Sequence, residues 1–232
     1  MNLETYTTGT GETTALLVHG AGAGAGTWHA LAPALVERGY RVVSVDLRGH
    51  GRSPRGGYSV QALGDDLADS LPAGADLALG HSVGGLALAL AVERLTPLRA
   101  VYLDPAFRMP PLPADAGERM RRVFETADAA HVRVMNPRWS DLDVEQELAG
   151  FAACDPEFYT FVAAEVAGRD LLPDKAHVPS LVLRARDAIT VDGRAAAELA
   201  ERGFDVHQVA GAAHCIHRDN LPGLLAGLDA WL

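Results

Sequence analysis

A serine between two glycines is the residue of this chain best placed to act as a nucleophile. The stretch Gly80-His81-Ser82-Val83-Gly84 has the spacing Gly-x-Ser-x-Gly, with an apolar run before it and an Ala/Leu-rich run after it. This pattern predicts a strand, a sharp turn and a helix, which would hold the Ser82 hydroxyl clear of the sheet on a strained backbone. The free N–H groups at the start of the helix would face any negative charge that forms beside the serine. The arrangement suits a nucleophile whose reaction generates an oxyanion.

A serine nucleophile needs two partners, and the sequence offers candidates for both. A base must accept the hydroxyl proton, and an imidazole base needs a carboxylate that holds its tautomer and stabilises its charge. His214 follows the last predicted strand, and Asp187 follows the strand before it. Because the carboxyl ends of parallel strands meet at one edge of a sheet, both side chains can reach the edge where Ser82 lies. Asp104, at the end of the strand after the serine, is an alternative acid.

The elements that must position these residues alternate along the chain. Apolar strands alternate with amphipathic helices, and the strands are expected at 15–19, 41–45, 76–80, 100–103, 180–184 and 205–209. Near-continuous apolar strands separated by helices predict an α/β fold, with a mainly parallel sheet covered by helices on both faces. Thr27 is expected to cap a helix over 28–37.

One segment interrupts this alternation. Residues 105–179 open with several prolines and then show three helical stretches, at about 115–129, 140–153 and 156–167, with Ser140 and Asp155 as the expected N-caps of the last two. We therefore predict a core formed by residues 1–104 and 180–232, with 105–179 inserted as a helical lid. The aromatic and methionine side chains of this segment either pack it onto the core or give the mouth above Ser82 an apolar wall.

Composition and charge narrow the function classes. The formal net charge is -10, and no cluster of basic residues marks a nucleic-acid interface. The sequence shows no secretory signal and no apolar run long enough to cross a bilayer, so we expect no membrane insertion. Cys154 and Cys215 lie far apart and suggest reduced thiols in a cytoplasmic protein.

Several stretches together resemble the α/β-hydrolase superfamily over essentially the whole chain apart from the predicted lid. The matching landmarks are Leu17-Val18-His19-Gly20, Asp46-Leu47-Arg48-Gly49-His50-Gly51-Arg52-Ser53, Gly80-His81-Ser82-Val83-Gly84-Gly85, Leu183-Arg184-Ala185-Arg186-Asp187 and Gly211-Ala212-Ala213-His214. Two positions depart from the family pattern, because Ala185 and Ala213 stand where glycine is usual.

The resemblance implies roles for individual residues. It makes Ser82 the nucleophile, His214 rather than His217 the base, and Asp187 the acid, although some members of the family carry the acid at the position of Asp104. It also implies an oxyanion hole formed by the backbone N–H groups of Ala21 and Val83. His19, His50 and His81 are expected to brace loops through hydrogen bonds.

The expected reaction is hydrolysis of a carboxylic ester, or of a related acyl substrate, through an acyl-enzyme. Thioester, lactone and carbon–carbon bond hydrolysis use the same residues and stay open. We expect a small-molecule substrate with an apolar group and no metal or organic cofactor. His214, Cys215 and His217 lack a second cluster that would complete a metal site. The sequence does not indicate an oligomeric state.

Two competing interpretations come from other classes. Gly20-Ala21-Gly22-Ala23-Gly24-Ala25 fits the dinucleotide-binding pattern Gly-x-Gly-x-x-Ala, and Asp46 could contact a ribose in an NAD-dependent oxidoreductase. Glycine–alanine repetition satisfies many patterns, however, and this interpretation leaves the serine, histidine and aspartate unexplained. The other alternative is a non-catalytic hydrolase-fold protein that only binds its ligand.

Overall fold

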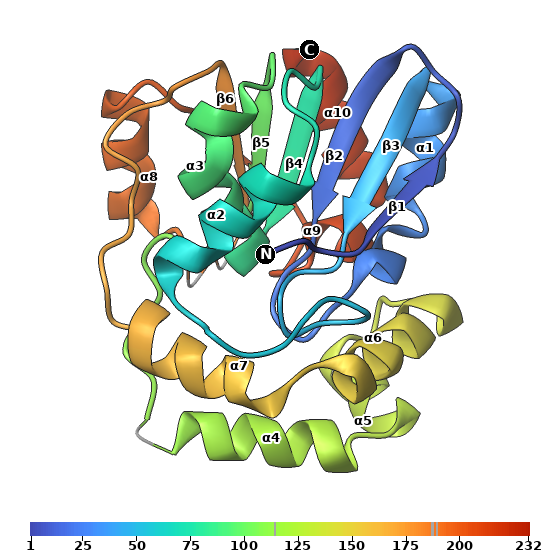
Figure 1. Ribbon diagram of the computed structural model, residues 1–232, viewed down its shortest axis with the longest axis vertical. Helices are drawn as coiled ribbons and strands as arrows, with labels where there is room; N and C mark the ends of the chain where they lie inside the picture. Colours follow the sequence, from blue (N-terminus) through green and yellow to red (C-terminus); the bar gives the residue numbers. More distant parts are fainter. Residues whose placement is uncertain (114, 187, 189) are drawn as a thin grey trace.

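A twisted sheet runs through the middle of the molecule and carries the segments that form the candidate site (Figure 1). The computed structural model describes residues 1–113, 115–186, 188 and 190–232. Its seven-stranded sheet has the order β1-β3-β2-β4-β5-β6-β7. The strands are β1 (Thr5–Thr8), β2 (Thr13–Val18), β3 (Tyr40–Val45), β4 (Leu77–His81), β5 (Ala100–Leu103), β6 (Ser180–Arg184) and β7 (Asp205–Gln208). All neighbours pair in parallel except β1, which runs antiparallel to β3 at one edge.

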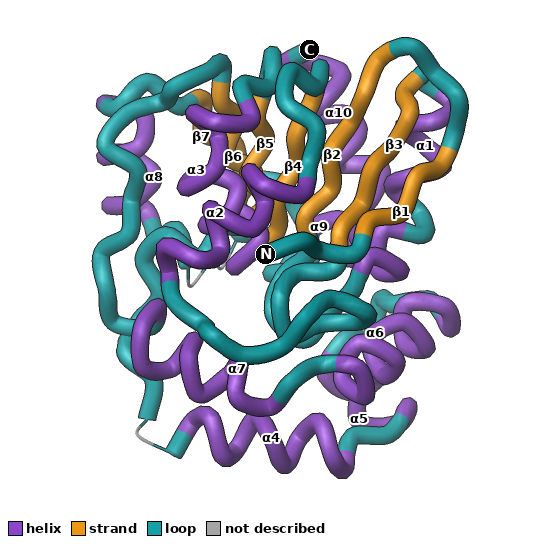
Figure 2. The backbone as a smooth tube through the Cα atoms, in the orientation of Figure 1, coloured by secondary structure: helices purple, strands orange, loops and turns teal. Residues whose placement is uncertain are grey.

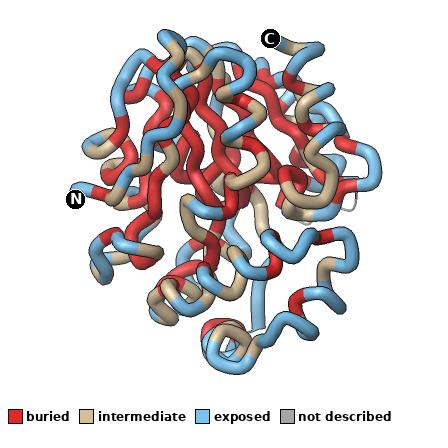
Figure 3. The backbone as a smooth tube through the Cα atoms, turned by 90° about the vertical axis from the view of Figure 1, so that its right-hand side faces the viewer, coloured by how far each residue is buried: buried red, intermediate tan, exposed pale blue. Residues whose placement is uncertain are grey.

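The sheet is buried because both of its faces are covered by helices, as expected. On β2, Leu16 and Val18 belong to the apolar cluster on one face, and Ala15 and Leu17 belong to the cluster on the other. The first face is covered by α2 (Val60–Ser70), α3 (Val83–Leu95) and α8 (Gly193–Glu201). The second is covered by α1 (Leu31–Glu37), α9 (Ile216–Asp219) and α10 (Leu221–Trp231). Buried strands therefore form the centre of the molecule (Figure 3).

Two predictions near the N-terminus need correction. The strand β1 was not predicted, because Thr5–Thr8 is a short edge strand that is mostly exposed and has no apolar run. The expected helix over 28–37 divides into a 3-10 turn, η1 (Ala25–Trp28), and α1 (Leu31–Glu37). The later start places Pro33 in the first turn of α1, where its missing N–H costs no helical hydrogen bond. Thr27 donates its hydroxyl to the Gly24 carbonyl instead of capping α1.

The segment 105–179 forms helices that lie beyond the carboxyl ends of the strands (Figures 1 and 2). They are α4 (Ala116–Thr126), α5 (Ala129–Met135), α6 (Asp141–Ala153) and α7 (Pro156–Phe161), followed by a π-helical turn, η2 (Val162–Val166). Ser140 and Asp155 cap α6 and α7 as predicted. The aromatic side chains largely pack on one another: the ring centroids of Phe124 and Phe151 lie 4.5 Å apart, and those of Phe124 and Tyr159 lie 4.6 Å apart.

Two expectations about the chain as a whole can be compared with the structure. Cys154 and Cys215 are both free thiols, as predicted. Across the residues that the structure describes, no helix has the length and apolar character required to span a bilayer.

Candidate active site

The candidate site lies at the carboxyl edge of the sheet, where loops from four strands meet. From β2 the chain adds β3 on one side of the sheet, and from β4 onward it adds strands on the other side, so the strand order reverses between the neighbours β2 and β4. Ligands of open α/β sheets bind at such a switch point. The glycine-rich loop from Gly20 follows β2, Ser82 follows β4, Asp104 follows β5, and His214 lies in the loop after β7.

Ser82 occupies the strained turn that its sequence predicts. Its backbone angles are φ 53° and ψ -121°, and α3 begins at the next residue. A side chain at either flanking glycine would collide with the backbone: a Cβ on Gly80 would lie 2.6 Å from the Gly84 carbonyl oxygen, and a Cβ on Gly84 would lie 2.2 Å from the His19 carbonyl oxygen. The glycines thus allow the close approach of strand, loop and helix that directs the serine outward.

A chain of hydrogen bonds joins three side chains at this edge. His214 Nε2 lies 3.0 Å from Ser82 Oγ, and His214 Nδ1 lies 2.6 Å from Asp104 Oδ2. Because a carboxylate only accepts, Nδ1 carries the proton, and Nε2 of the neutral imidazole then accepts from the serine hydroxyl. The Asp104 side chain is fully buried, whereas the His214 side chain is 39% exposed. The imidazole therefore has access to the cavity while its acid partner is shielded from solvent.

Asp104 is held in place by further hydrogen bonds. Its φ is 40°, a left-handed conformation that Asp tolerates better than most residues. The Ala185 N–H donates to its second carboxylate oxygen at 3.3 Å, and the Thr190 hydroxyl donates to its carbonyl at 3.2 Å. Asp187, the acid favoured by the sequence, lies outside the described residues. In the structure, the partner of His214 is the alternative, Asp104.

The two amides expected to form an oxyanion hole lie beside the serine. Ala21 lines the same cavity as Ser82 and His214, and Val83 is the first residue of α3. Neither backbone N–H donates a hydrogen bond to another described residue, so both donors are available to a ligand.

Two buried histidines brace the glycine-rich loop, as expected from the sequence. His50 Nε2 accepts from the Gly22 N–H at 2.9 Å, and its Nδ1 donates to the Arg48 carbonyl. His19 Nε2 accepts from the Leu47 N–H, and its Nδ1 donates to the Gly20 carbonyl. Each ring must be neutral to make both bonds. Burial is the main cause that lowers the pKa of His50 to about 3, and it also lowers the pKa of His19.

His81 and His217 line the same cavity as Ser82 without bonding to it. His81 Nε2 donates to the His214 carbonyl at 3.0 Å, which ties the residue before the nucleophile to the loop that carries the imidazole. The His217 ring packs against Trp28, with the ring centroids 4.4 Å apart, and His217 Nδ1 has no hydrogen-bond partner among the described residues. Burial holds the pKa of both rings well below the usual range. Both side chains are therefore neutral polar groups in the wall of the cavity.

The cavity at Ser82 is small, and most of its described lining residues carry polar side chains. It has a volume of about 130 Å³, and Glu147 is the only residue of the segment 105–179 among its described lining residues. The aromatic side chains of that segment do not line it, and Phe158 and Phe161 belong to the core cluster on the first face of the sheet, which favours the interpretation that the aromatics pack the segment onto the core. Across the described chain, no three His, Cys, Asp or Glu side chains gather as a potential metal site.

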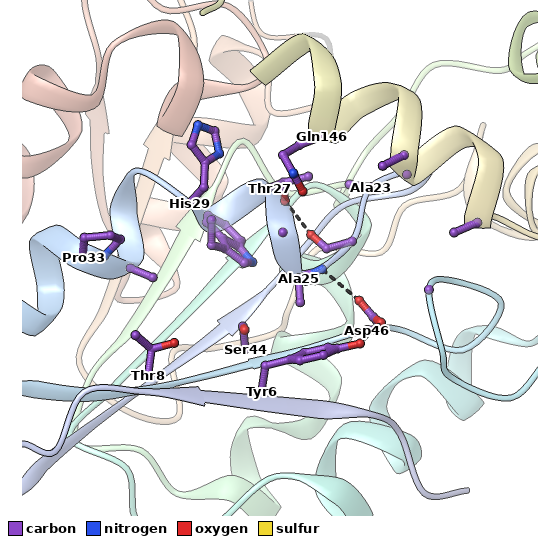
Figure 4. A pocket seen from close by; sticks show the side chains of 18 residues that line it. Tyr6, Thr8, Ala23, Ala25, Thr27, His29, Pro33, Ser44, Asp46 and Gln146 are labelled. Atoms are coloured by element: carbon purple, nitrogen blue, oxygen red, sulfur yellow. Dashed lines mark hydrogen bonds between the residues drawn. The ribbon is translucent and has the colours of Figure 1, made fainter. Parts of the chain in front are cut away.

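A larger pocket of about 560 Å³ lies beside the glycine-rich loop, between η1, the β1–β3 edge and α6 (Figure 4). Ala23 lines this pocket as well as the cavity at Ser82, but Ser82 and His214 do not line it. Asp46, the candidate ribose ligand, turns its carboxylate to the protein itself. It accepts from the Tyr6 hydroxyl, the Ala25 N–H and the Arg52 N–H. These bonds make Asp46 a structural residue of the loop rather than a dinucleotide contact.

An ion pair in the cavity was not predicted from the sequence. Arg218, four residues after His214, donates from Nη1 to Glu147 Oε2 at 2.6 Å. Its guanidinium also lies over the Trp139 ring, 4.4 Å from the centroid. No local pattern links residues 147 and 218. The only feature of the sequence that could have pointed to this ion pair is an arginine four residues after the candidate base.

The sheet, the strained serine and the histidine beside it define an α/β protein of the hydrolase type. A family model described as "Alpha/beta hydrolase family" matches residues 15–226, and the chain belongs to this family. Family membership argues against the dinucleotide-binding interpretation of residues 20–25, because the family match includes this loop.

The chain is also similar to individual known proteins in sequence and in structure. The chain is 44% identical over 99 residues to a pimeloyl-[acyl-carrier protein] methyl ester esterase of Aeromonas hydrophila subsp. hydrophila, a match that spans 40% of this chain and 38% of that protein. A deformylase from Pseudomonas putida S16 has a similar structure, with a TM-score of 0.81, 23% identity and coverage of 97% of this chain and 96% of that one. An enol-lactonase from Burkholderia xenovorans LB400 has a TM-score of 0.75 and 22% identity, over 99% and 95% of the two chains. At these identities the two structures bear on the fold alone.

Proposed function

We propose that this protein is a serine hydrolase that cleaves a carboxylic ester or a closely related acyl substrate. The observation that carries the proposal is the hydrogen-bond chain from Ser82 Oγ through His214 to the buried Asp104 carboxylate. Family membership and the similarity to a named methyl ester esterase support it.

The geometry suits two-step acyl transfer. His214 Nε2 accepts the Ser82 proton as the oxygen attacks the substrate carbonyl, and the Asp104 carboxylate stabilises the imidazolium that forms. The N–H groups of Ala21 and Val83 stabilise the oxyanion. The imidazolium then donates its proton to the departing alcohol, and a water activated by the same imidazole hydrolyses the acyl-enzyme.

In this proposal Asp104, rather than Asp187, is the acid. Its carboxylate lies at hydrogen-bonding distance from His214 Nδ1, with both of its oxygens engaged. The helical segment 105–179 acts as a lid, because it lies beyond the strand ends and places Glu147 in the wall of the cavity.

The test is covalent labelling followed by turnover. A fluorophosphonate probe should label the wild-type protein, and 4-nitrophenyl acetate or butyrate should be hydrolysed. Ser82→Ala should abolish labelling and lower kcat by about 10,000-fold or more, because the nucleophile is gone. Labelling that persists in Ser82→Ala at the wild-type rate would refute the assignment of the nucleophile.

A further inference from the structure

Arg218 is the only cation among the described residues that line the cavity at Ser82. It lies in the short helix α9 directly after the His214 loop, so the segment that positions the imidazole also positions the guanidinium. Its side chain is only 2% exposed. A buried guanidinium is costly unless its donors are satisfied, because it has lost its hydration.

The described partners of Arg218 use only part of its hydrogen-bonding capacity. Nη1 donates to Glu147, and the Trp139 ring covers one face of the guanidinium. Nε is buried and has no hydrogen-bond partner among the described residues. An arginine side chain carries five N–H donors, so the described residues leave part of the donor capacity of this cavity-lining residue unused.

A purely structural role explains these contacts less completely. The ion pair does join the helical segment 105–179 to the histidine-bearing segment, but a second contact already does so: Trp139 Nε1, in the loop before α6, donates to Asp219 Oδ1 at 3.1 Å. An attachment of the helical segment requires neither a guanidinium inside the reaction cavity nor unused donors there. A ligand with an acceptor group explains both.

We infer that Arg218 binds a carboxylate on the substrate, so that the preferred substrates are anionic half-esters whose carboxylate lies a few bonds from the scissile carbonyl. This inference rests on the proposed function. The cavity of about 130 Å³ limits the acyl part to a short chain. Glu147 orients the guanidinium, and the carboxylate of the substrate takes donors that Glu147 leaves.

The experiment compares esters of matched length. Monoethyl succinate and ethyl butyrate differ mainly in one terminal carboxylate, and the ethyl ester of 4-(trimethylammonio)butyrate provides a cationic counterpart. Release of acid is followed at constant pH. The wild-type protein should hydrolyse monoethyl succinate with a kcat/KM at least about tenfold above that of ethyl butyrate, because hydrogen bonds to charged groups are among the stronger ones.

The variants remove both charges of the pair together. Arg218→Gln alone would leave the Glu147 carboxylate without its partner, so the decisive variant is Arg218→Gln with Glu147→Gln. The ratio of the two kcat/KM values should fall by about 10- to 100-fold. Arg169→Gln is the matched control, because Arg169 is half-exposed and pairs with Glu165 on the surface; it should leave the ratio unchanged.

The outcomes separate this inference from the proposed function. A wild-type ratio near one, a ratio unchanged in the double variant, or a preference for the cationic ester would overturn the inference, while labelling of Ser82 would still support the hydrolase. If neither ester is hydrolysed, the affinity of Ser82→Ala for monoethyl succinate is measured by calorimetry and tests the inference instead. Binding should weaken at least about tenfold when Arg218→Gln and Glu147→Gln are added, and equal affinities would overturn the inference.

Discussion

Replacement of Asp104 by asparagine tests the proposed mechanism at the 2.6 Å contact between Asp104 Oδ2 and His214 Nδ1. Asparagine keeps the size of the side chain and tolerates the left-handed backbone at φ 40°, so the fold should be preserved. The Ala185 N–H donates to Oδ1, which favours the oxygen of the new amide on that side. The amide nitrogen would then face His214 Nδ1 and donate to it.

This reversal of the hydrogen bond sets the expected size of the effect. Nδ1 would become the acceptor, and the proton would move to Nε2, which could no longer accept from Ser82. In serine proteases the same change of tautomer lowers kcat by about 10,000-fold, and we expect a loss of about 1,000- to 10,000-fold here. At about 1.4 kcal/mol for each factor of ten, this corresponds to about 4 to 5.5 kcal/mol of transition-state stabilisation.

The assay is steady-state hydrolysis of 4-nitrophenyl butyrate, with circular dichroism and thermal unfolding to check the fold. Asp187→Asn is the matched control, since it removes the carboxylate that the sequence favours as the acid. We expect it to retain kcat within about tenfold of the wild type. If Asp104→Asn stays within tenfold and Asp187→Asn loses more than 1,000-fold, the acid assignment drawn from the hydrogen bond is wrong.

Two further predictions concern the loops that carry the site. Burial lowers the pKa of His50 to about 3, so below about pH 6.5 the unfolded chain binds a proton that the folded one does not. The free energy of unfolding should therefore fall as the pH drops from 6.5 towards 3. Urea unfolding between pH 6 and pH 4 measures this dependence, and in His50→Gln the slope of the unfolding free energy against pH should be smaller by about 1.4 kcal/mol per pH unit. Equal slopes in the wild type and the variant would contradict this. Gly84→Ala should destabilise the protein by about 3 kcal/mol or more, because its Cβ would lie 2.2 Å from the His19 carbonyl oxygen. Gly193→Ala, which meets no atom within 4 Å, should change the unfolding free energy by less than about 1 kcal/mol, and similar effects of the two changes would refute the steric argument.

Local patterns accounted for much of the fold because strands and helices leave short periodic signals. The apolar runs at 15–19 and 76–80 correspond to β2 and β4, and the caps at Ser140 and Asp155 begin α6 and α7 as expected. The edge strand Thr5–Thr8 carried no such signal, since its residues are polar and mostly exposed. It exists because β3 offers an open edge, which is a property of the assembled sheet.

The sequence by itself determined the strained serine, the strand that carries it and the imidazole brought to the same edge, because each depends on residues close together in the chain. Only the tertiary structure decided which carboxylate contacts His214. In the sequence, Asp104 and Asp187 each come after a strand, and among the described residues the Asp104 carboxylate contacts Nδ1 across 110 residues of chain. The pairing of Arg218 with Glu147 was decided in the same way, since it joins α9 to a helix of the inserted segment. Such contacts follow from how distant segments pack, and no short-range pattern encodes them.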